Sequence, residues 1–539
     1  MDTEFAPEEQ KLLEPYFTNL NKPVFVLTNL PEVVKGALFS RYSRSDKSLR
    51  RILLDEFIKD KEMGFKEIVG SHSNSTGQLV AIKKAEEFYD RVLVGYGDDS
   101  VAELGGAHIA IEQVSNIAAK FIEDSRLGIS PLEKSTRYVY FDKKVDGKYL
   151  YHPEKKIINS RHADLYVRTC DMLFDEYSAL IEETKKFLQE KFPKEADVSD
   201  RAYNSTIKAK ACDILRNFLP SATLTNIGLF GNGRAFEYLL TKMYSSDLNE
   251  VNDVAASMQE ELSKVIPSFV KRAKGEYGDP TIKFFSETRN AMEKYYHSKA
   301  GIEKPSLKEV ELVSFDKDAE LKVCSAALYP HSNLSLGQLH EKVRRMAKDE
   351  RQKIINEYCS RRQNRRHRPG RAFEHAYYEF DLLLNFASYR DLHRHRVQTQ
   401  QRQLLTVEHG FDVQPEMKEL GIDKRYEEAM KSAAEAFWEI HKEMPKEAQY
   451  IVPFGYRVRW SASLNLRELY HLVELRSTIH GHADYRRVVI NMYEEVKKVQ
   501  PSLIEWMKFV DRRETGLERL DSEKKLDKKM EEVKKKYGQ

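Results

Sequence analysis

Apolar residues recur at helical spacing in several stretches of the chain. Between residues 248 and 265 they fall at Leu248, Val251, Val254, Met258, Leu262 and Val265. In the tail, residues 520–539, they fall among many lysines at Leu526, Met530, Val533 and Tyr537. Spacing of three and four residues places such side chains on one face of a helix. It predicts a core helix at 248–265 and an amphipathic terminal helix that packs on the body of the protein.

Short runs typical of β-strands occur at 24–28, 136–141 and 310–314. The first and last of these each precede an apolar-rich helical segment, at 32–40 and 319–328. A further apolar run, 380–386, is expected to be a buried helix. With only 24 glycines and 17 prolines in 539 residues, helix should dominate. The predicted fold class is therefore α/β (α+β type), helix-rich.

The chain also repeats itself. Pro220 and Pro453 lie in similar segments, as do Asn232 and Asn465, and both pairs differ by the same 233 positions. Glu103 parallels Glu374 at an offset of 271. A tandem duplication explains such paired offsets. The expected domains are an N-terminal extension (1–21), copy one (22–275), a connector (276–307), copy two (308–510) and a charged C-terminal helix (511–539).

Composition narrows the functional classes. The 88 basic and 85 acidic side chains nearly cancel, so bulk attraction to nucleic acid or to an anionic membrane is not expected. The four cysteines lie far apart, which argues against a disulfide framework or a zinc site and fits a cytoplasmic protein. No apolar run approaches the ~20 residues that span a bilayer.

The segment 390–402 is the strongest candidate for chemistry. It holds six basic or imidazole side chains in thirteen positions: Arg390, His393, Arg394, His395, Arg396 and Arg402. Arginine forks suit phosphate and carboxylate anions, although a solvated cationic face is the simpler alternative. A second Arg-His-Arg triplet, at 366–368, sits before Pro369-Gly370 in an arginine-rich turn, 361–371, so the triplet alone does not identify the site.

The motifs around this segment resemble those of a known family. Several short motifs, in the same order in both copies, are similar to those of the flavin-dependent thymidylate synthases (ThyX). Those of copy two are Phe373-Glu-His375, His393-Arg-His-Arg396, Tyr450-Ile-Val-Pro-Phe454, Asn465-Leu-Arg467, Leu475-Arg476 and His482-Ala483. Those of copy one are Gly97-Asp-Asp-Ser100-Val-Ala-Glu103, Ser135-Thr-Arg-Tyr138, Arg216-Asn-Phe-Leu-Pro220 and Asn232-Gly-Arg234.

The two copies lack different parts of the family's site, which lies between subunits of a homotetramer. Copy two keeps Arg394, His395, Arg396, Asn465, Arg467 and Arg476, but has Leu404, Thr406 and Gln449 where the neighbour's serine and arginines would stand. Copy one keeps Glu133, Ser135, Arg137 and Arg216, but lacks the Arg-His-Arg and has Met243 at the place of Arg476. The resemblance therefore implies one composite site and one degenerate site.

The resemblance also implies roles. The catalytic group would be Arg476, Arg394 and His395. The dUMP-binding group would be Glu133, Ser135, Arg137, Arg216, Arg394 and Arg476. The FAD-binding group would be Arg394, His395, Arg396, Asn465, Arg467, His471, Ser100, Asn232 and Arg234, and no metal is expected. Asp391 stands where glutamine is common, and an acid there would repel an anionic substrate unless it is paired.

The implied reaction is reductive methylation of dUMP, with FAD as cofactor and NADPH and methylenetetrahydrofolate as co-substrates. Cofactors carry the difficult steps, so the protein mainly binds, orients and supplies charge. A homodimer would mimic the family's tetramer. The alternative is a catalytically inactive nucleotide-, flavin- or nucleic-acid-binding protein on the same scaffold, for which the arginines at 361–371 and the lysine-rich tail are the supporting features.

Overall fold

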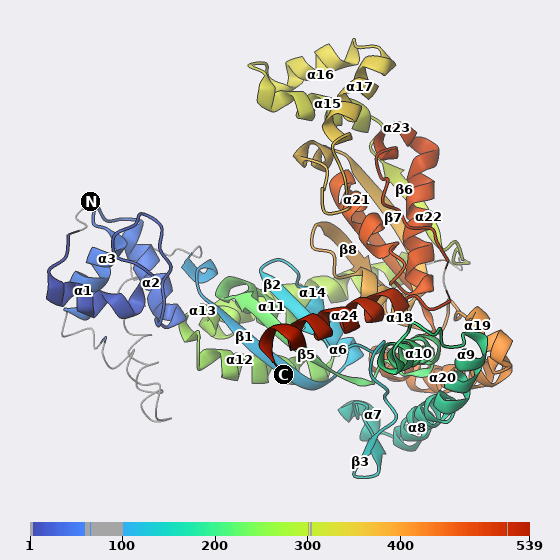
Figure 1. Ribbon diagram of the computed structural model, residues 1–539. Coiled ribbons are helices and arrows are strands. Elements are labelled where there is room, and N and C mark those ends of the chain that lie inside the picture. The colour runs from blue at the N-terminus through green and yellow to red at the C-terminus, as the bar shows by residue number, and fades with distance from the viewer. Residues whose placement is uncertain are drawn as a thin grey trace. The chain divides into compact units, whose positions relative to one another are not determined.

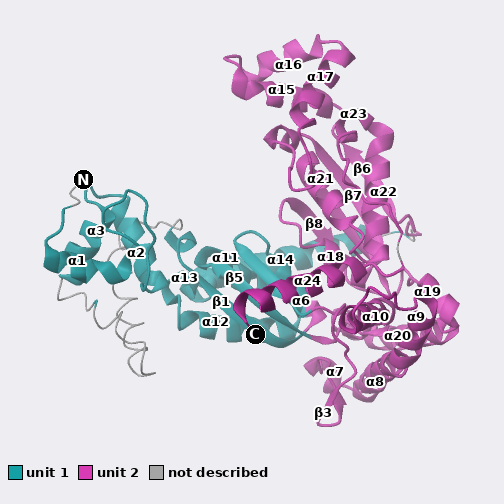
Figure 2. Ribbon diagram, in the orientation of Figure 1, with its two compact units in different colours: residues 1–114, 118–134, 225–303 teal, residues 115–117, 135–224, 304–539 magenta. Residues whose placement is uncertain are grey.

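The computed structural model describes residues 4–59, 65, 101–299, 301, 304–514 and 516–538 (Figure 1). Its contacts divide the chain into two compact units (Figure 2). Unit 1 comprises residues 1–114, 118–134 and 225–303, and unit 2 comprises 115–117, 135–224 and 304–539. Both combine many helices with small antiparallel sheets, which confirms the helix-rich α+β class. Residues 135–224, from the expected copy one, thus belong to the same unit as the expected copy two.

Unit 1 is built around a three-stranded sheet of order β1-β5-β2. Helix α11, which follows β5, packs against α12, α13 and α14. Its strands are β1 (Gly106–Ser115), β2 (Ile129–Glu133) and β5 (Leu224–Asn232). Its α-helices are α1 (Pro7–Leu13), α2 (Glu32–Tyr42), α3 (Leu49–Ile52), α6 (Asn116–Glu123), α11 (Gly233–Tyr244), α12 (Asn249–Ser263), α13 (Pro267–Val270) and α14 (Gly275–Lys299). Shorter helical turns are η1 (Glu14–Tyr16), η2 (Leu53–Ile58), η4 (Val101–Glu103) and η6 (Lys271–Ala273).

The part of unit 2 that precedes copy two is almost entirely helical. It contains a small hairpin, β3 (Lys144–Val145) and β4 (Lys148–Tyr149), followed by α7 (Lys155–Ile158), α8 (Ala163–Ala179), α9 (Ile181–Lys191), α10 (Asp200–Leu215) and η5 (Arg216–Phe218). Helix α10 is buried along most of its length, and η5 continues directly from its end.

The rest of unit 2 surrounds a four-stranded antiparallel sheet of order β6-β7-β9-β8. The strands are β6 (Val310–Phe315), β7 (Tyr377–Asn385), β8 (Gln398–Arg402) and β9 (Arg457–Asn465). The helices are α15 (Ala319–Leu328), α16 (Leu336–Arg344), α17 (Lys348–Cys359), α18 (Phe386–Leu392), α19 (Pro415–Leu420), α20 (Asp423–His441), α21 (Leu466–Arg476), α22 (Ala483–Val499), α23 (Pro501–Ile504) and α24 (Leu520–Tyr537), with turns η7 (Tyr329–His331), η8 (Arg371–His375) and η9 (Glu447–Ile451).

The two sheets repeat one design. In each, the central strand (β5 or β9) leads directly into a helix (α11 or α21) whose first turn is capped by an asparagine. Asn232 Oδ1 accepts from the backbone N–H of Ala235 at 2.8 Å, and Asn465 Oδ1 accepts from that of Glu468 at 2.9 Å. Such caps satisfy donors that a helix leaves unpaired at its start. The neighbouring strands also correspond, because β1-β5-β2 matches β7-β9-β8. The structure therefore supports the tandem repeat.

Within unit 2, two equivalent segments of the repeat pair with each other. Ser221 N–H donates to the carbonyl of Val452, and Phe454 N–H donates to the carbonyl of Leu219, each at 2.9 Å. Every residue in one of these bonds has its 233-offset equivalent in the other. Exchange of the two segments thus leaves the pattern unchanged, which is the property of an isologous, two-fold contact.

Three predicted elements are wrong. The run 380–386 lies mostly in β7, the strand between β6 and β9, and the helix begins only at Phe386. A strand that is covered on both faces is apolar without alternation, so its sequence looks like a buried helix. The runs at 24–28 and 136–141 form no strand: Leu27 makes one isolated bridge to Phe17, and residues 136–138 form a turn.

The other predicted elements are confirmed. Segment 32–40 lies in α2, 248–265 forms α12, 310–314 lies in β6 and 319–328 is α15. Within the expected connector, residues 276–299 belong to α14. The tail forms α24, which packs on α10. Its apolar residues remain partly exposed, however, from 37% at Met530 to 68% at Tyr537.

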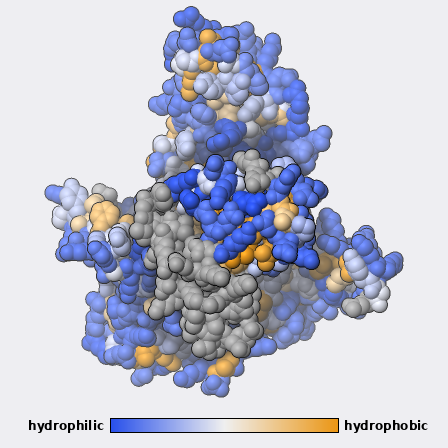
Figure 3. Space-filling model, turned by 90° about the vertical axis from the view of Figure 1, so that its left-hand side faces the viewer, coloured by the Kyte–Doolittle hydropathy of each residue, from blue (hydrophilic) through white to orange (hydrophobic). Residues whose placement is uncertain are grey.

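The surface agrees with the charged composition. On the face drawn in Figure 3 hydrophilic residues predominate and apolar residues form scattered patches. Among the helices of the described ranges, none combines the length and the apolar character that crossing a bilayer requires.

Candidate functional site

The predicted basic segment runs from α18 into β8. Asn385 ends β7 and caps α18, since its Oδ1 accepts from Ser388 N–H at 2.8 Å. Arg390, on α18, is buried; its Nη1 donates to Thr136 Oγ1 at 3.2 Å and its guanidinium lies 4.5 Å from the Phe454 ring centre. Arg390 therefore connects the copy-two helix to the Ser135–Tyr138 turn of copy one, and both belong to unit 2.

A hydrogen-bonded chain fixes His395 and Arg476. His395 is 4% exposed; its Nδ1 lies 2.7 Å from Glu468 Oε1, and Arg476 Nε donates to its Nε2 at 3.1 Å. A guanidinium can only donate, so Nε2 must accept and Nδ1 carries the hydrogen that is donated to Glu468. The carboxylate thus selects the imidazole tautomer that holds the predicted catalytic arginine. Glu468 was not among the predicted residues.

His471 lies beside this chain, with its ring centre 5.3 Å from that of His395. Burial lowers the pKa of His471 to about 4, so the ring is neutral at physiological pH. Arg368 Nη2 lies 3.2 Å from its Nε2. The second Arg-His-Arg triplet does sit on a turn, as predicted, but its last arginine reaches this cluster.

The ligand atoms of His395, Glu468 and His471 all lie within 4.8 Å of one another, close enough to share a metal ion. A metal-bound imidazole keeps a hydrogen on its other nitrogen, which then needs an acceptor. Here Arg476 and Arg368 present donors to the Nε2 atoms. Metal binding would therefore place donor against donor, and two guanidinium groups would repel the ion. The three side chains form a hydrogen-bonded cluster that is poorly suited to a cation.

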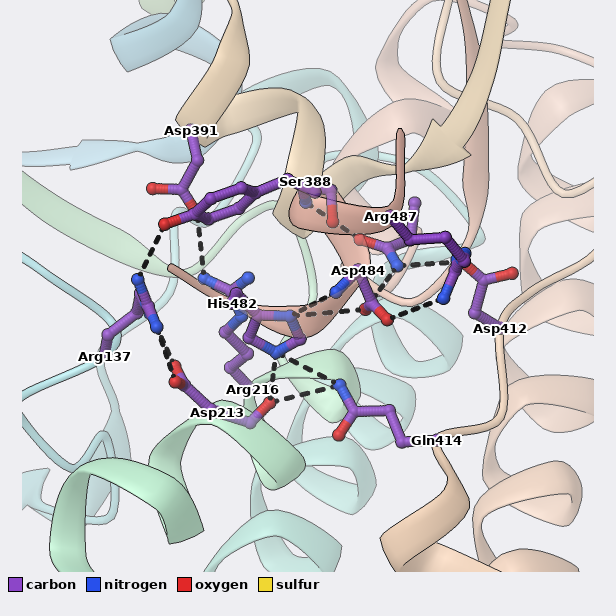
Figure 4. A network of polar contacts seen from close by, with 12 residues as sticks. Arg137, Asp213, Arg216, Ser388, Asp391, Asp412, Gln414, His482, Asp484 and Arg487 are labelled. Atoms are coloured by element: carbon purple, nitrogen blue, oxygen red, sulfur yellow. Dashed lines mark hydrogen bonds and ion pairs between the residues drawn. The ribbon is translucent and has the colours of Figure 1, made fainter. Parts of the chain in front are cut away.

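On the copy-one side, Ser135 and Arg137 form a tight turn. Arg137 N–H donates to Ser135 Oγ at 3.2 Å. The Arg137 side chain donates from Nε and Nη2 to the two carboxylate oxygens of Asp213, both at 2.7 Å, and from Nη1 to Tyr485 Oη at 3.2 Å (Figure 4). Burial opposes the charged form, yet Asp213 raises the pKa of Arg137 well above its usual range. Arg137 is thus firmly held, with much of its fork already engaged.

Arg216 is in the opposite situation. It is 2% exposed, and its only ion pair with a residue that the structure describes is Nη1 to Asp391 Oδ2 at 3.4 Å. Its Nε and Nη2 have no hydrogen-bond partner among the described residues, nor do the side-chain atoms of the fully buried neighbour Asn217. Leaving a buried charged donor without a partner is costly, about 1–3 kcal/mol or more. Such groups are what an anion-binding site provides.

Asp391 marks where the two copies converge (Figure 4). Burial by itself raises the pKa of this carboxyl, but Arg216, Arg137, Arg476 and Arg394 together hold it well below its usual range. Two of these arginines come from copy one and two from copy two, and all belong to unit 2. The acid at 391 is therefore paired, and the four predicted arginines lie near one carboxylate.

The N-terminal end of α22 adds polar contacts to the cluster. Asp484 N–H donates to His482 Nδ1 at 3.2 Å, so Nε2 carries the hydrogen and faces the backbone carbonyl of Asp213 at 3.3 Å. Burial, with Arg216 adding to it, lowers the pKa of His482 and so favours the neutral ring. Asp213 and Tyr485 are further residues that were not predicted. The nearest motifs in the sequence were Arg216-Asn-Phe-Leu-Pro220 for Asp213 and His482-Ala483 for Tyr485.

Of the remaining copy-two residues, Asn465 and Arg467 have structural partners. Asn465 is the cap of α21 described above, and Arg396 is exposed. Arg467 donates from Nε to the carbonyl of Pro369 at 2.8 Å and from Nη1 to Glu374 at 3.0 Å. In copy one the equivalent Arg234 pairs with Glu103 at 2.9 Å.

Three predicted residues lie in unit 1. Glu133 forms a buried ion pair with Lys120 at 2.7 Å. Asn232 and Arg234 line a pocket of about 790 Å³, with Tyr238 and Tyr277 among its other residues. Ser100 lies outside the described residues.

The arginine-rich turn 361–371 is partly structural. Arg362 makes a buried bidentate ion pair with Glu474, at 3.1 and 2.5 Å, and donates to the carbonyl of Trp506. Arg361 pairs with Glu357 and Arg371 with Glu374. These pairs reduce the charge that the turn could offer to nucleic acid.

Comparison with known proteins agrees with this picture. The family described as thymidylate synthase complementing protein (Thy1) matches residues 51–268 and 311–502. A UPF0159 protein of Chlamydia muridarum is 42% identical over 523 residues, which cover 96% of this chain and 98% of the relative. A UPF0159 protein of Thermoplasma acidophilum is 34% identical, over 91% of this chain and 97% of the relative.

A shorter match is also informative. A flavin-dependent thymidylate synthase of Sulfurisphaera tokodaii is 29% identical over 216 residues, 37% of this chain and 77% of the relative. The family's sequence pattern thus occurs in two successive segments of this chain. With both segments matched and the repeat visible in the two sheets, the chain belongs to the Thy1 family of thymidylate synthase complementing proteins.

Proposed function

We propose that this chain is an FAD-dependent thymidylate synthase that converts dUMP to dTMP at one composite site. The observation that carries the proposal is Arg216, a buried arginine with two donors that have no partner among the described residues. It lies beside Asp391, whose charge Arg394 and Arg476 of the other copy also stabilise. A substrate anion would complete this arrangement.

The local charge suits a nucleotide monophosphate. The four cations Arg137, Arg216, Arg394 and Arg476 and the two anions Asp213 and Asp391 leave a net charge of +2. A phosphate monoester carries about −1.5 to −2 at pH 7. In this proposal Arg216 donates to the phosphate, and Arg137, held by Asp213, supplies charge from its Nη1 side.

The other dUMP contacts are assigned by position. The Ser135 hydroxyl accepts from Arg137 N–H, which suits a residue that shapes the phosphate-binding turn rather than a nucleophile. Glu133 remains a proposed contact. Arg476 is the proposed catalytic cation: His395 fixes its Nε, and a fixed cation near charge that develops on the uracil ring lowers the barrier.

The residues present fit a flavin nucleotide. Arg394, His395, Arg396, Asn465, Arg467 and His471 would hold it, because neutral imidazoles and arginine forks suit an anionic, hydrogen-bonding cofactor and do not suit a metal ion. When bound, FAD supplies hydride transfer, with NADPH as reductant and methylenetetrahydrofolate as one-carbon donor. Ser100, Asn232 and Arg234 remain proposed flavin contacts from copy one.

The assembly we propose is a homodimer. A two-fold contact of the kind that homo-oligomers form between subunits is already made within one chain, at residues 219–222 and 450–455. Two chains would then supply four copies. Light scattering over a range of concentrations tests this: a mass near 126 kDa, twice the 62.9 kDa chain, supports it, and a tetramer of chains contradicts it.

The decisive experiment loads the purified chain with FAD. We expect a yellow protein with one flavin per chain, NADPH oxidation that dUMP stimulates, and dTMP as product when methylenetetrahydrofolate is present. Two flavins per chain would mean that the degenerate site also binds flavin. A colourless protein that cannot be loaded would refute the proposal.

A second candidate is an inactive nucleotide-binding protein. It is favoured by Asp213, which occupies the fork of Arg137, and by the acid at Asp391. In that case the chain binds dUMP and FAD but forms no dTMP, so the product assay separates the two.

A further inference from the structure

The segment that follows copy two enters the site. It lies beyond residue 502, where the family match ends. Helix α24 is anchored on the start of α10 by ion pairs: Arg201 with Glu523 at 2.7 Å and with Asp527, whose carboxylate also accepts from Ser199. Lys210, further along α10, pairs with Glu518 at 2.9 Å. These contacts fix the chain on either side of residue 519.

Arg519 points from this segment toward the copy-one turn. It is 6% exposed. Its Nη1 donates to the backbone carbonyl of Arg137 at 3.1 Å, its Nη2 lies 3.8 Å from Asp213 Oδ2, and its guanidinium stacks 4.0 Å from the Tyr138 ring centre. Nη2 has no hydrogen-bond partner among the described residues. Arg519 therefore places a second arginine beside Asp213.

The charge of that pair explains what Arg519 adds. Arg137 and Asp213 together are neutral, and a carboxylate that accepts from two of its three nitrogens weakens the attraction of Arg137 for any other anion. Arg519 shares the carboxylate and restores one positive charge to the group. It also holds the carbonyl at the centre of the Ser135–Tyr138 turn, so the turn and the charge depend on the same side chain.

We infer that Arg519 is a positioning residue that gives the site its preference for a phosphorylated substrate, through Arg137 and Asp213. The inference rests on the proposed function, since it takes the Arg137–Arg216 side of the site to bind the phosphate of dUMP. The C-terminal segment is then part of the substrate site. It affects the binding of the phosphate of dUMP and not the binding of the base.

The test compares dUMP with deoxyuridine, which lacks the phosphate, on the full-length, flavin-loaded chain. Calorimetric titration of Arg519→Gln should show about tenfold weaker binding of dUMP, about 1.4 kcal/mol, and unchanged binding of deoxyuridine. Arg519→Lys keeps the charge but cannot stack on Tyr138 and reach both the Arg137 carbonyl and Asp213, so its affinity for dUMP should fall between those of the parent chain and Arg519→Gln. The matched control is Arg513→Gln, an arginine of the same segment that is 73% exposed and paired with Asp511; it should change neither affinity.

Three outcomes would overturn the inference: unchanged dUMP binding in Arg519→Gln, equal weakening of both ligands, or a lysine variant as weak as the glutamine variant. A parent chain that binds no dUMP would instead refute the proposed function. Titration with inorganic phosphate then tests Arg519 alone, with weaker phosphate binding in Arg519→Gln expected and equal binding contradicting it.

Discussion

Residues 216 and 449 occupy the same place in the two copies and behave in opposite ways. The Gln449 side chain is satisfied by its own surroundings: Oε1 accepts from Leu405 N–H at 3.0 Å, and Nε2 donates to the carbonyl of Lys446 at 2.9 Å. Arg216 is equally buried, yet two of its donors have no partner among the described residues. Gln449 completes the hydrogen bonding of its own copy, whereas Arg216 keeps donors that a ligand could use.

The pair formed by residues 243 and 476 shows the reverse. Met243, in copy one, is a fully buried apolar side chain of α11, whereas Arg476, in copy two, donates to His395. Each copy thus has packing at one of the two positions and polar chemistry at the other. The comparison teaches that burial alone does not distinguish a core residue from a site residue; the state of its hydrogen bonds does.

The largest effect is expected at Arg394, for which copy one has Ser125. Arg394→Ala should lose flavin binding, at least about 100-fold, because an arginine fork to an anionic cofactor is removed. Flavin absorbance after gel filtration measures it. Arg366→Ala, an exposed arginine of the second triplet, is the control and should bind flavin normally. Equal retention in both variants would contradict the assignment.

Arg216→Gln gives copy one the residue of copy two and tests the comparison directly. We expect about 100-fold weaker dUMP binding, about 2.7 kcal/mol, since a buried cationic contact is lost. The ligand-free chain should lose about 1 kcal/mol or more of stability, because Asp391 keeps its charge but loses its ion-pair partner. Calorimetry and urea unfolding measure the two effects, and Arg344→Gln, at an exposed arginine, is the control. Normal dUMP binding would refute the role.

Glu468 has Ala235 as its counterpart in copy one. Glu468→Gln keeps an acceptor for His395 but removes the charge that fixes the tautomer, so Arg476 is held less firmly. We expect kcat to fall about tenfold with KM for dUMP changed less than twofold. Glu439→Gln, at an exposed acid, is the control. A change in KM alone would contradict this role, because it would mean that Glu468, His395 and Arg476 act in dUMP binding and not in the chemical step.

The smallest effect concerns His471, for which copy one has Tyr238. Its pKa is about 4 in the folded chain, against 6.5 for an ordinary histidine. The unfolded state therefore binds more protons between these values, and the free energy of unfolding should fall as the pH is lowered from 6.5 to 4. His471→Asn should reduce this slope, measured by urea unfolding at pH 6.5, 5.5 and 4.5. His482 and His409, whose pKa values are also lowered, leave a residual slope. An unchanged slope would contradict the buried, neutral state.

The sequence predicted the repeat and the arginines that lie near Asp391, because both can be recognised from the spacing of motifs along the chain. It did not predict the groups that hold them. Asp213 is 76 residues from Arg137 and Glu468 is 73 from His395; their roles arise only when the chain folds. Arg519, 382 residues from Arg137, lies outside every motif.

The error at 380–386 has a related cause. Periodicity reports which faces are covered, and a central strand is covered on both faces like a buried helix. The turn at Ser135–Tyr138 was misread as a strand for another reason: its form depends on the Ser135 hydroxyl and on the Arg137–Asp213 pair, which local propensity does not contain.

The paired backbone segments around Pro220 and Pro453 have a consequence for assembly. Partners joined by one polypeptide meet at an effective concentration set by the tether, so dilution cannot separate them. A protein that builds this contact from separate subunits would lose it as the concentration falls, and would present every site twice. Here the two copies are always present in equal number, so each copy can supply site residues that the other copy lacks.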